Sequence, residues 1–344
     1  MKIELIRRDQ TQYKANLHCH STVSDGHKTP KELIDLYRAA GYSVLAITDH
    51  EVPNSHFGKS TEDFLLLTGY ECYIRVDPSA VYDIYQPEVH LNLFPRDPAN
   101  ETFICYNPNY AKYIRRIRPI EELKRAGSER TREYNRAYVQ EYIDTAIANG
   151  YLVAYNHAYW SMEAEADILS YNGCFSMEIR NGGSDLSNGI EYNAQLYDKM
   201  LLSGKRIFCH AGDDNHNSHP VEDPRSDSFL AWTYIMADSL THADVIGAME
   251  RGDMYASSGP KIHALSVEDH RVHIECSPAK HIYVYTGSKA PKCLHAAEGE
   301  TVTVADLTVD ARAKYIRVSV FDAERNTADT RGYFPDELGW EATR

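Results

Sequence analysis

Strand-like and helix-like segments alternate along the first 258 residues, and this alternation constrains the fold more than any other feature of the sequence. Helical spacing is clear at Pro30–Ala40 and again from about Ser128 to Asn149. Thr29 can cap the first of these helices, Pro30 suits its first turn and Gly41 suits its end. Strand, helix and strand at this spacing predict parallel βαβ units.

The strand-like segments of this first part are short apolar runs of the kind that buried sheets use. They are Ala15–His18, Ser43–Thr48, Phe64–Thr68, His90–Phe94, Leu152–Tyr155, Phe175–Ile179 and Arg206–His210. Such strands in series favour a closed barrel over an open sheet. We therefore expect an α/β barrel in this part of the chain.

The pattern changes at Ser257-Ser258-Gly259-Pro260, after which the helical period disappears. Short strand-like segments follow at His273–Cys276, His281–Tyr285, Thr301–Val304 and Tyr315–Phe321. Short strands separated by turn signals predict a small all-β sandwich. We therefore expect two domains, a barrel over residues 1–258 and a β-sandwich over residues 259–344.

The composition argues against several classes of protein. Lys and Arg number 36 against 50 Asp and Glu, a net charge of −14, which opposes a broad DNA or RNA contact. The sequence contains no apolar run long enough for a transmembrane helix and begins without the apolar segment of a signal peptide. Its 7 cysteines form no CxxC pair, which is typical of a reduced protein. We expect a cytoplasmic protein that binds neither membrane nor nucleic acid.

Histidines and acidic residues follow almost every predicted strand of the first part. The candidates are His18, His20, Asp25, His50, Glu71, His90, His157, Asp214 and His216. The carboxyl ends of strands in an α/β barrel converge on one mouth, where active sites lie. Residues i and i+2 of a strand point to the same side, so His18 and His20 can bind one ion, and Asp214 and His216 repeat the arrangement.

This candidate set combines imidazoles with carboxylates, and such a mixed set suits zinc, manganese or iron rather than calcium. The residues are too many for a single ion. With Glu71 as a bridge, they divide into a site for two or three divalent ions. Ions of this kind acidify bound water, which points to a hydrolase.

Five motifs occur together and in a fixed order: HCHSTVSDG at 18–26, TDH at 48–50, GYE at 69–71, NH at 156–157 and DNH at 214–216. As a set they resemble the PHP (polymerase and histidinol phosphatase) family of metal-dependent phosphoesterases, over roughly residues 13–258. The resemblance implies a distorted seven-stranded (β/α) barrel with a di- or trinuclear site. It also implies three ligand sets: His18, His20, Glu71 and Asp214; Glu71, His90 and His157; and Asp25, His50 and His216.

The Ser-Ser-Gly-Pro junction and the trailing β-domain resemble the CehA/McbA-like branch of this family, which includes carbamate-ester hydrolases. Ala158 departs from the family, which often has proline after the His of the NH motif. Few neighbouring residues fix the assignment of His90. His210 and Asp213 compete with the assigned ligands at the same strand end.

The resemblance implies hydrolysis of a small-molecule phosphate ester, most simply a phosphomonoester, by a metal-bound hydroxide. Asp25, Glu71 and His216 are the candidate catalytic residues, with the group that protonates the leaving alcohol left open. Arg180 and Asn181, at the end of another predicted strand, are candidates for binding the phosphorylated substrate. A surface ion pair is the alternative role for Arg180.

Three other functions compete with a phosphoesterase. The same hydroxide could attack carbon in a carbamate, carboxylic ester or amide, and the resemblance to the CehA/McbA-like branch keeps this alternative. A proofreading exonuclease conflicts with the net charge of −14. A metal- or sugar-binding module conflicts with the complete ligand set. The sequence leaves open the substrate, the metal, the oligomeric state and the purpose of the β-domain.

Overall fold

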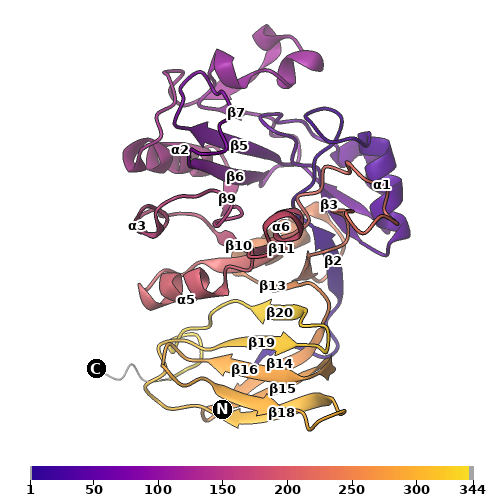
Figure 1. The fold of residues 1–344 in the computed structure, drawn as a ribbon, viewed down its shortest axis with the longest axis vertical. Helices are drawn as coiled ribbons and strands as arrows, with labels where there is room; N and C mark the ends of the chain where they lie inside the picture. Colours follow the sequence, from indigo (N-terminus) through magenta and orange to yellow (C-terminus); the bar gives the residue numbers. More distant parts are fainter. Residues whose placement is uncertain (1, 341–344) are drawn as a thin grey trace.

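The computed structural model describes residues 2–340 and has a mixed α/β fold. In Figure 1 most of the first half of the chain, indigo to magenta, lies at the top, whereas the N-terminus lies at the bottom with the C-terminal sheets, orange and yellow. The α-helices are α1 (Pro30–Ala39), α2 (Arg136–Ala148), α3 (Glu165–Ile168), α4 (Gly182–Asn188), α5 (Ala194–Leu202) and α6 (His242–Arg251). No helix within residues 2–340 is long and apolar enough to cross a membrane.

The largest sheet runs through both halves of the molecule. Its strands in order are β17 (Lys292–His295), β16 (His281–Tyr285), β19 (Arg317–Phe321), β20 (Thr327–Thr330), β13 (Met254–Ser257), β12 (Trp232–Met236), β2 (Gln12–Asn16), β3 (Val44–Ala46) and β4 (Leu65–Leu67). As expected, β2, β3 and β4 are parallel. β13 pairs with β20, so one continuous sheet crosses the junction expected at residue 258.

The candidate metal ligands lie between the strands β2–β4 and a second sheet. Its order is β11 (Phe208–Gly212), β10 (Ser176–Asn181), β9 (Tyr151–Tyr155), β6 (Glu88–Pro95) and β5 (Tyr70–Arg75). Two isolated parallel bridges join it to the first sheet, one from Cys19 to Asn215 and one from His50 to Glu71. The β2–β4 strands and this second sheet are therefore in contact at both edges.

The prediction of parallel βαβ units is wrong at β6, which runs antiparallel to both β5 and β9. The physical reason is the connection: a loop over residues 76–87, without a helix, joins β5 to β6. A short connection reverses the chain direction, whereas a parallel strand needs a long crossover. The reversal matters for the site, because it brings the beginning of β6, and with it His90, to the edge where the neighbouring strands end.

The third sheet has the order β1 (Lys2–Ile6), β14 (Ile262–Glu268), β15 (Arg271–Ala279) and β18 (Val302–Thr308). Its buried side chains, such as Ile274, share one hydrophobic cluster with Val284 and Val318 of the largest sheet. The N-terminal strand thus pairs with the C-terminal part of the chain, although the sequence pattern placed it with the barrel. Its alternating exposed and half-buried residues gave no sign of that distant partner.

Helix α1 begins where the sequence predicts. The Thr29 side chain accepts a hydrogen bond from the Glu32 amide, and Glu32 reaches back to the Thr29 amide, which completes a capping box. The longer helix expected from about Ser128 begins only at Arg136, because Asn135 caps it there by accepting a hydrogen bond from the Tyr138 amide. The residues before that cap belong to an extended insertion that includes the short pair β7 (Phe103–Ile104) and β8 (Arg125–Ala126).

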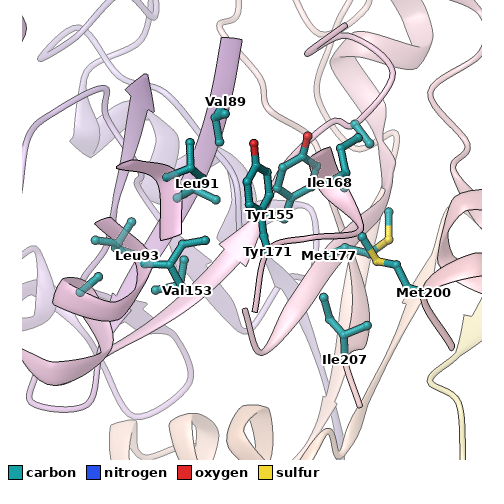
Figure 2. Close-up of a cluster of buried hydrophobic side chains, with 14 of the residues drawn as sticks. Val89, Leu91, Leu93, Val153, Tyr155, Ile168, Tyr171, Met177, Met200 and Ile207 are labelled. Carbon is teal, nitrogen blue, oxygen red and sulfur yellow. The ribbon is translucent and has the colours of Figure 1, made fainter. Parts of the chain in front are cut away.

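The main hydrophobic core lies between the second sheet and the helices α2, α3 and α5. Figure 2 shows side chains of β6, β9 and β10 directed toward residues from the helices and connections. Every residue of β6 and β9 is buried, and β9 accordingly appears in the sequence as a continuous apolar run. This core holds the strand ends that carry the candidate ligands in fixed positions.

One acidic side chain, Glu163, enters the edge of this core between tyrosines. The hydroxyl groups of Tyr155 and Tyr171 donate to its carboxylate at 2.6 and 2.7 Å. Burial raises the pKa of Glu163 to about 7, although hydrogen bonds from these tyrosines and from Tyr134 oppose that shift, and the charge of Asp167 adds to it. The folded protein therefore favours the neutral form of this carboxyl group.

Glu163→Gln is expected to make the protein more stable at alkaline pH. In the wild type, the free energy of unfolding should fall as the pH rises from the unfolded pKa of 4.5 to about 7, because the folded state resists ionisation. The variant should lack this fall and be more stable at pH 8 by about 3 kcal/mol, with little difference at pH 4.5. Urea unfolding of the metal-free proteins across this range measures the difference. Parallel curves for the two proteins would contradict the prediction.

Candidate metal centre

The first two candidate ligands follow the end of β2. His18 and His20 are fully buried, and the intervening Cys19 packs on the opposite side in a hydrophobic cluster with Leu33 and Tyr37. The segment is fixed by backbone hydrogen bonds, including one from the His20 amide to the Asn215 carbonyl at 3.1 Å. The predicted i and i+2 geometry is therefore present, and both imidazoles enter the same interior space.

Glu71, at the beginning of β5, lies at the centre of the candidate ligands. Its carboxylate is fully buried, and the imidazoles of His18, His50 and His90 each approach one of its oxygens to between 3.0 and 3.2 Å. The His157 Nε2 lies 3.3 Å from Glu71 Oε1, and the His20 Nε2 lies 3.4 Å from Oε2. A single carboxylate thus touches five histidines that are distant in sequence, which is the position expected of a bridging ligand.

Three groups of ligand atoms lie close enough together to hold an ion, with all atoms of a group within 4.8 Å of one another. The groups are His18, His20, Glu71 and Asp214; His20, Asp25, His50 and His216; and His50, Glu71 and His90. The first coincides with the first set that the family resemblance implies. The second group shares His20 with the first and His50 with the third. The division of the ligands among separate ions therefore stays a prediction.

The electrostatics of the group follow from mutual contact in a buried space. Burial alone would raise the pKa of Glu71 and Asp214, but the neighbouring histidines hold both well below the usual range. Burial alone would lower the pKa of His20, yet hydrogen bonds to Asp214 and Glu71 raise it to about 10. In the same way Glu71 and Glu88 raise the pKa of His90 to about 9 against the effect of burial. Without a cation, these carboxylates draw protons onto the imidazoles.

Several buried atoms of the group lie close to oppositely charged neighbours but make no hydrogen bond of good geometry. They are His18 Nε2, His20 Nε2, His50 Nδ1, His90 Nε2 and Glu71 Oε2. Buried polar atoms in native proteins are almost always paired, so such a concentration of unpaired atoms indicates a missing ligand. Imidazole nitrogens with carboxylate oxygens are the donors that divalent transition ions prefer. The residues present therefore fit the binding of such ions.

Glu178, at the end region of β10, supports the ligands from behind. Its buried carboxylate accepts a hydrogen bond from the His18 ring at 3.1 Å and from the His157 amide at 3.0 Å. A carboxylate that holds the second nitrogen of a ligating imidazole fixes the ring and its tautomer. Asn181 joins this arrangement, donating to Glu178 at 2.8 Å and to Asp214 at 3.1 Å.

Three other polar residues near the ligands, Asp49, Asp213 and His210, make hydrogen bonds to the surrounding structure. Asp49 accepts hydrogen bonds from the amides and hydroxyls of Ser21 and Ser24 and so holds the loop that follows the histidines. Asp213 accepts from the Tyr37 hydroxyl at 2.6 Å and from backbone amides at 229–231. His210 faces the Ser176 hydroxyl at 3.0 Å. Of the two competitors, neither belongs to a ligand group among residues 2–340.

The two candidates for substrate binding differ from the sequence-based expectation. The Arg180 guanidinium donates to the Ser258 hydroxyl at 2.7 Å and covers the Tyr192 ring, and it does not line the cavity above the metal ligands. Asn181 lies behind the ligands, as its hydrogen bond to Glu178 shows, and is absent from the cavity lining. The strand pattern could not predict this, because the register of β10 against β11 shifts between Glu178 and Arg180.

A cavity of about 540 Å³ opens above the ligand group. Most of the candidate ligands reach its floor: Asp25, His50, Glu71, His90, His157, Asp214 and His216. Sequence reasoning missed much of its wall, including Arg75, Lys112, Trp160 and Ser184. These residues lie outside the five motifs: Arg75 ends β5, Ser184 lies in α4, and Lys112 and Trp160 lie in connections. Tyr82 and Tyr113 also line the cavity.

Comparisons with known proteins give short or distant similarities. No protein-family model matches the chain. A 5′-3′ exoribonuclease of Haemophilus influenzae is 39% identical over 62 residues, which is 17% of this chain and 23% of that protein. The chain thus matches less than a quarter of the length of this curated relative.

Similar solved structures cover more of the chain. A two-domain protein of Bacteroides vulgatus, which contains a predicted PHP-like metal-dependent phosphoesterase, matches with a TM-score of 0.43 and 13% identity over 95% of this chain and 96% of that one. A protein of Bifidobacterium adolescentis, itself a metal-dependent phosphoesterase by prediction, has a TM-score of 0.39 and 17% identity over 70% and 96%. An amidohydrolase of Chromobacterium violaceum has a TM-score of 0.39 and 17% identity over 59% and 87%.

Proposed function

We propose that the chain is a metal-dependent phosphoesterase of the PHP type that hydrolyses a small-molecule phosphomonoester. The observation that carries this proposal is the contact of one buried carboxylate, Glu71, with five histidines at the floor of an open cavity. On this proposal, β2–β4 and the five strands of the second sheet form the distorted barrel, which has eight strands where the family resemblance implies seven. Residues from 259 onward, with β1 added, are the β-sandwich domain. The CehA/McbA-like branch and a cytoplasmic location stay predictions.

Two or three divalent ions, of zinc, manganese or iron, would be held by the nine candidate ligands. When bound, such ions acidify water to supply hydroxide near neutral pH and offset the charge of a phosphate. The chain's own contribution is to place the ligands rigidly. The buried Glu178 and Glu71 fix imidazole rings that the strand ends have brought together.

The wall of the cavity supplies positive charge to a phosphate in a chain whose overall charge is negative. Lys112 and Arg75 line the cavity, and neither is one of the candidate metal ligands. Arg75 is held in place by Glu88 and by a hydrogen bond to the Ala80 carbonyl at 2.8 Å. Cations positioned in this way stabilise charge that grows on phosphate oxygens in the transition state.

Asp25 and His216 are the candidates for proton transfer at the cavity surface. The Asp25 carboxylate lies 3.5 Å from His216 Nε2 and 3.6 Å from His50 Nε2. Burial alone would raise the pKa of Asp25, but the hydrogen bond with His216 and the charges of His50 and His20 hold it well below the usual range. Asp25 is therefore ionised at neutral pH and can accept a proton or hold a cation. His216 is left as the candidate that donates the proton to the leaving alcohol.

A comparison of three ester substrates tests the proposed function. Metal-loaded protein is expected to hydrolyse p-nitrophenyl phosphate faster than bis(p-nitrophenyl) phosphate and p-nitrophenyl acetate. Turnover of the acetate alone would instead support the alternative of a carbamate, carboxylic ester or amide hydrolase. Absence of turnover of every ester, with the metals bound, would reject both.

His20→Ala is expected to lower kcat/KM for p-nitrophenyl phosphate by about a thousandfold, because it removes an imidazole shared by two of the ligand groups. Circular dichroism should show that the fold is retained. The matched control is His295→Ala, which removes an exposed histidine of β17 that pairs with His281. Retained activity in His20→Ala would reject the role given to this residue.

A further inference from the structure

A second cavity, of about 690 Å³, adjoins the one above the metal ligands. Two aromatic residues, Tyr82 and Trp160, line both cavities. The second cavity also has a set of apolar side chains in its lining: Ile84, Ala158, Met162, Ile168 and Leu196. The two cavities therefore border the same two rings, and the second has a largely apolar wall.

Trp160 separates this space from the metal centre. Its ring stands edge-on to His90 and His157, with centroids 5.1 and 4.8 Å away. On the side of the second cavity it lies nearly parallel to Tyr82, with centroids 6.4 Å apart and 9° between the planes. Both distances are within the range of aromatic contact, so the rings form a continuous aromatic wall that begins at the metal ligands.

A buried carboxylate fixes the position of this wall. Glu191 is fully buried, and its two oxygens accept hydrogen bonds from the amides of Tyr159 and Trp160, each at 2.9 Å. The Arg75 guanidinium also lies over the Tyr82 ring, 5.2 Å from its centroid. Tyr82 is 52% exposed, so part of its side chain is available for contact.

The two cavities also differ in charge. The first contains Arg75 and Lys112 together with the candidate metal ligands. The second is lined by four acidic residues and, among residues 2–340, by no lysine, arginine or histidine; the acidic residues are Asp83, Glu88, Glu165 and Glu163, the last of which burial holds largely neutral. With cations held by its ligands, the first cavity attracts an anion, whereas the carboxylates of Asp83, Glu88 and Glu165 repel one from the second.

We infer that the second cavity binds the alcohol part of the substrate and that this part is a flat aromatic group without negative charge. The inference rests on the proposed function, since it places the phosphate in the first cavity. The aromatic group would stack on Tyr82 and Trp160 while the phosphate reaches the metal ligands. Substrates with a second phosphate or a carboxylate on the alcohol would meet the acidic lining and be disfavoured.

Phosphonates, which cannot be hydrolysed, test this inference as inhibitors of p-nitrophenyl phosphate turnover. We expect 2-naphthylmethylphosphonate to inhibit the wild-type protein about tenfold more strongly than methylphosphonate. A carboxylate on the naphthyl ring should remove most of that advantage. Tyr82→Ala should reduce the preference for the naphthyl compound severalfold, measured as the ratio of its inhibition constant to that of methylphosphonate. Trp160→Phe, a milder change beside the metal ligands, should weaken naphthyl binding in the same direction.

The matched control is Tyr85→Ala, which removes a tyrosine of the same loop that is 79% exposed and lines neither cavity. Equal inhibition by the naphthyl and methyl compounds, or a preference unchanged in Tyr82→Ala, would overturn the inference. These outcomes differ from failure of the proposed function, which would appear as absence of turnover for every phosphate ester, whatever its alcohol.

Discussion

Glu71→Gln is expected to lower kcat/KM for phosphate-ester hydrolysis by about a thousandfold and to reduce the number of bound metal ions. The amide has nearly the same size but lacks the charge and presents one oxygen where the carboxylate presents two. In the wild type both oxygens are used: Oε1 faces His18, His90 and His157, and Oε2 faces His20 and His50. The loss of one acceptor therefore affects every ligand group that shares this residue.

Elemental analysis and steady-state kinetics on the same preparation measure this effect. The control is Glu250→Gln, in which the altered carboxylate pairs with Arg96 on the surface. The control should keep the wild-type metal content and activity. A Glu71→Gln protein with full metal content and activity would show that the central carboxylate does not bridge ions.

Arg132→Met is expected to lower the free energy of unfolding by 3–5 kcal/mol, about the loss found when one partner of a buried ion pair is removed. Arg132 and Glu51 are both buried, and Arg132 Nη2 donates to Glu51 Oε2 at 2.9 Å. Arg132 also donates to the Tyr73 carbonyl at 2.7 Å and covers the Tyr110 ring. Methionine fills a similar volume but leaves the Glu51 carboxylate without its cation.

The same substitution should also affect the metal centre. Glu51 directly follows His50, adopts a positive φ of 55°, and accepts a hydrogen bond from the Tyr73 amide at 2.9 Å. Arg132 thus connects the insertion before α2 to the backbone that carries a candidate ligand. Urea unfolding measures the loss in the free energy of unfolding. The control is Arg130→Met, which removes an exposed side chain that pairs with Glu133 and Glu141. A loss below about 1 kcal/mol, as for a surface pair, would contradict this account.

The candidate ligands could be predicted from sequence because each obeys a local rule. His18 and His20 share a side through the two-residue repeat of an extended chain, and Glu71 follows apolar residues where an unpaired carboxylate would be unfavourable. His90 also lies at this edge, but the prediction of parallel strands does not explain why. The reversal of β6 brings its first residues, rather than its last, to the ligand group.

Features that depend on contacts between distant segments could not be predicted. Nothing local to Arg132 indicates its partner Glu51, which lies 81 positions earlier. β1 pairs with β14 across more than 250 residues, and its pattern of half-buried positions suits many partners. The roles of Trp160 and Arg180 could not be predicted either. Distant segments of the fold decide that Trp160 lines the cavity and that Arg180 binds Ser258.

The central claim is that imidazole and carboxylate side chains from distant strand ends bind a group of divalent ions around Glu71. Anomalous diffraction from crystals grown with manganese tests it most directly. The account predicts anomalous peaks in contact with Glu71, one of them between His18, His20 and Asp214, whose ligand atoms already lie within 4.8 Å of one another. Side chains in the positions described here, with no anomalous peak among them at saturating manganese, would contradict it.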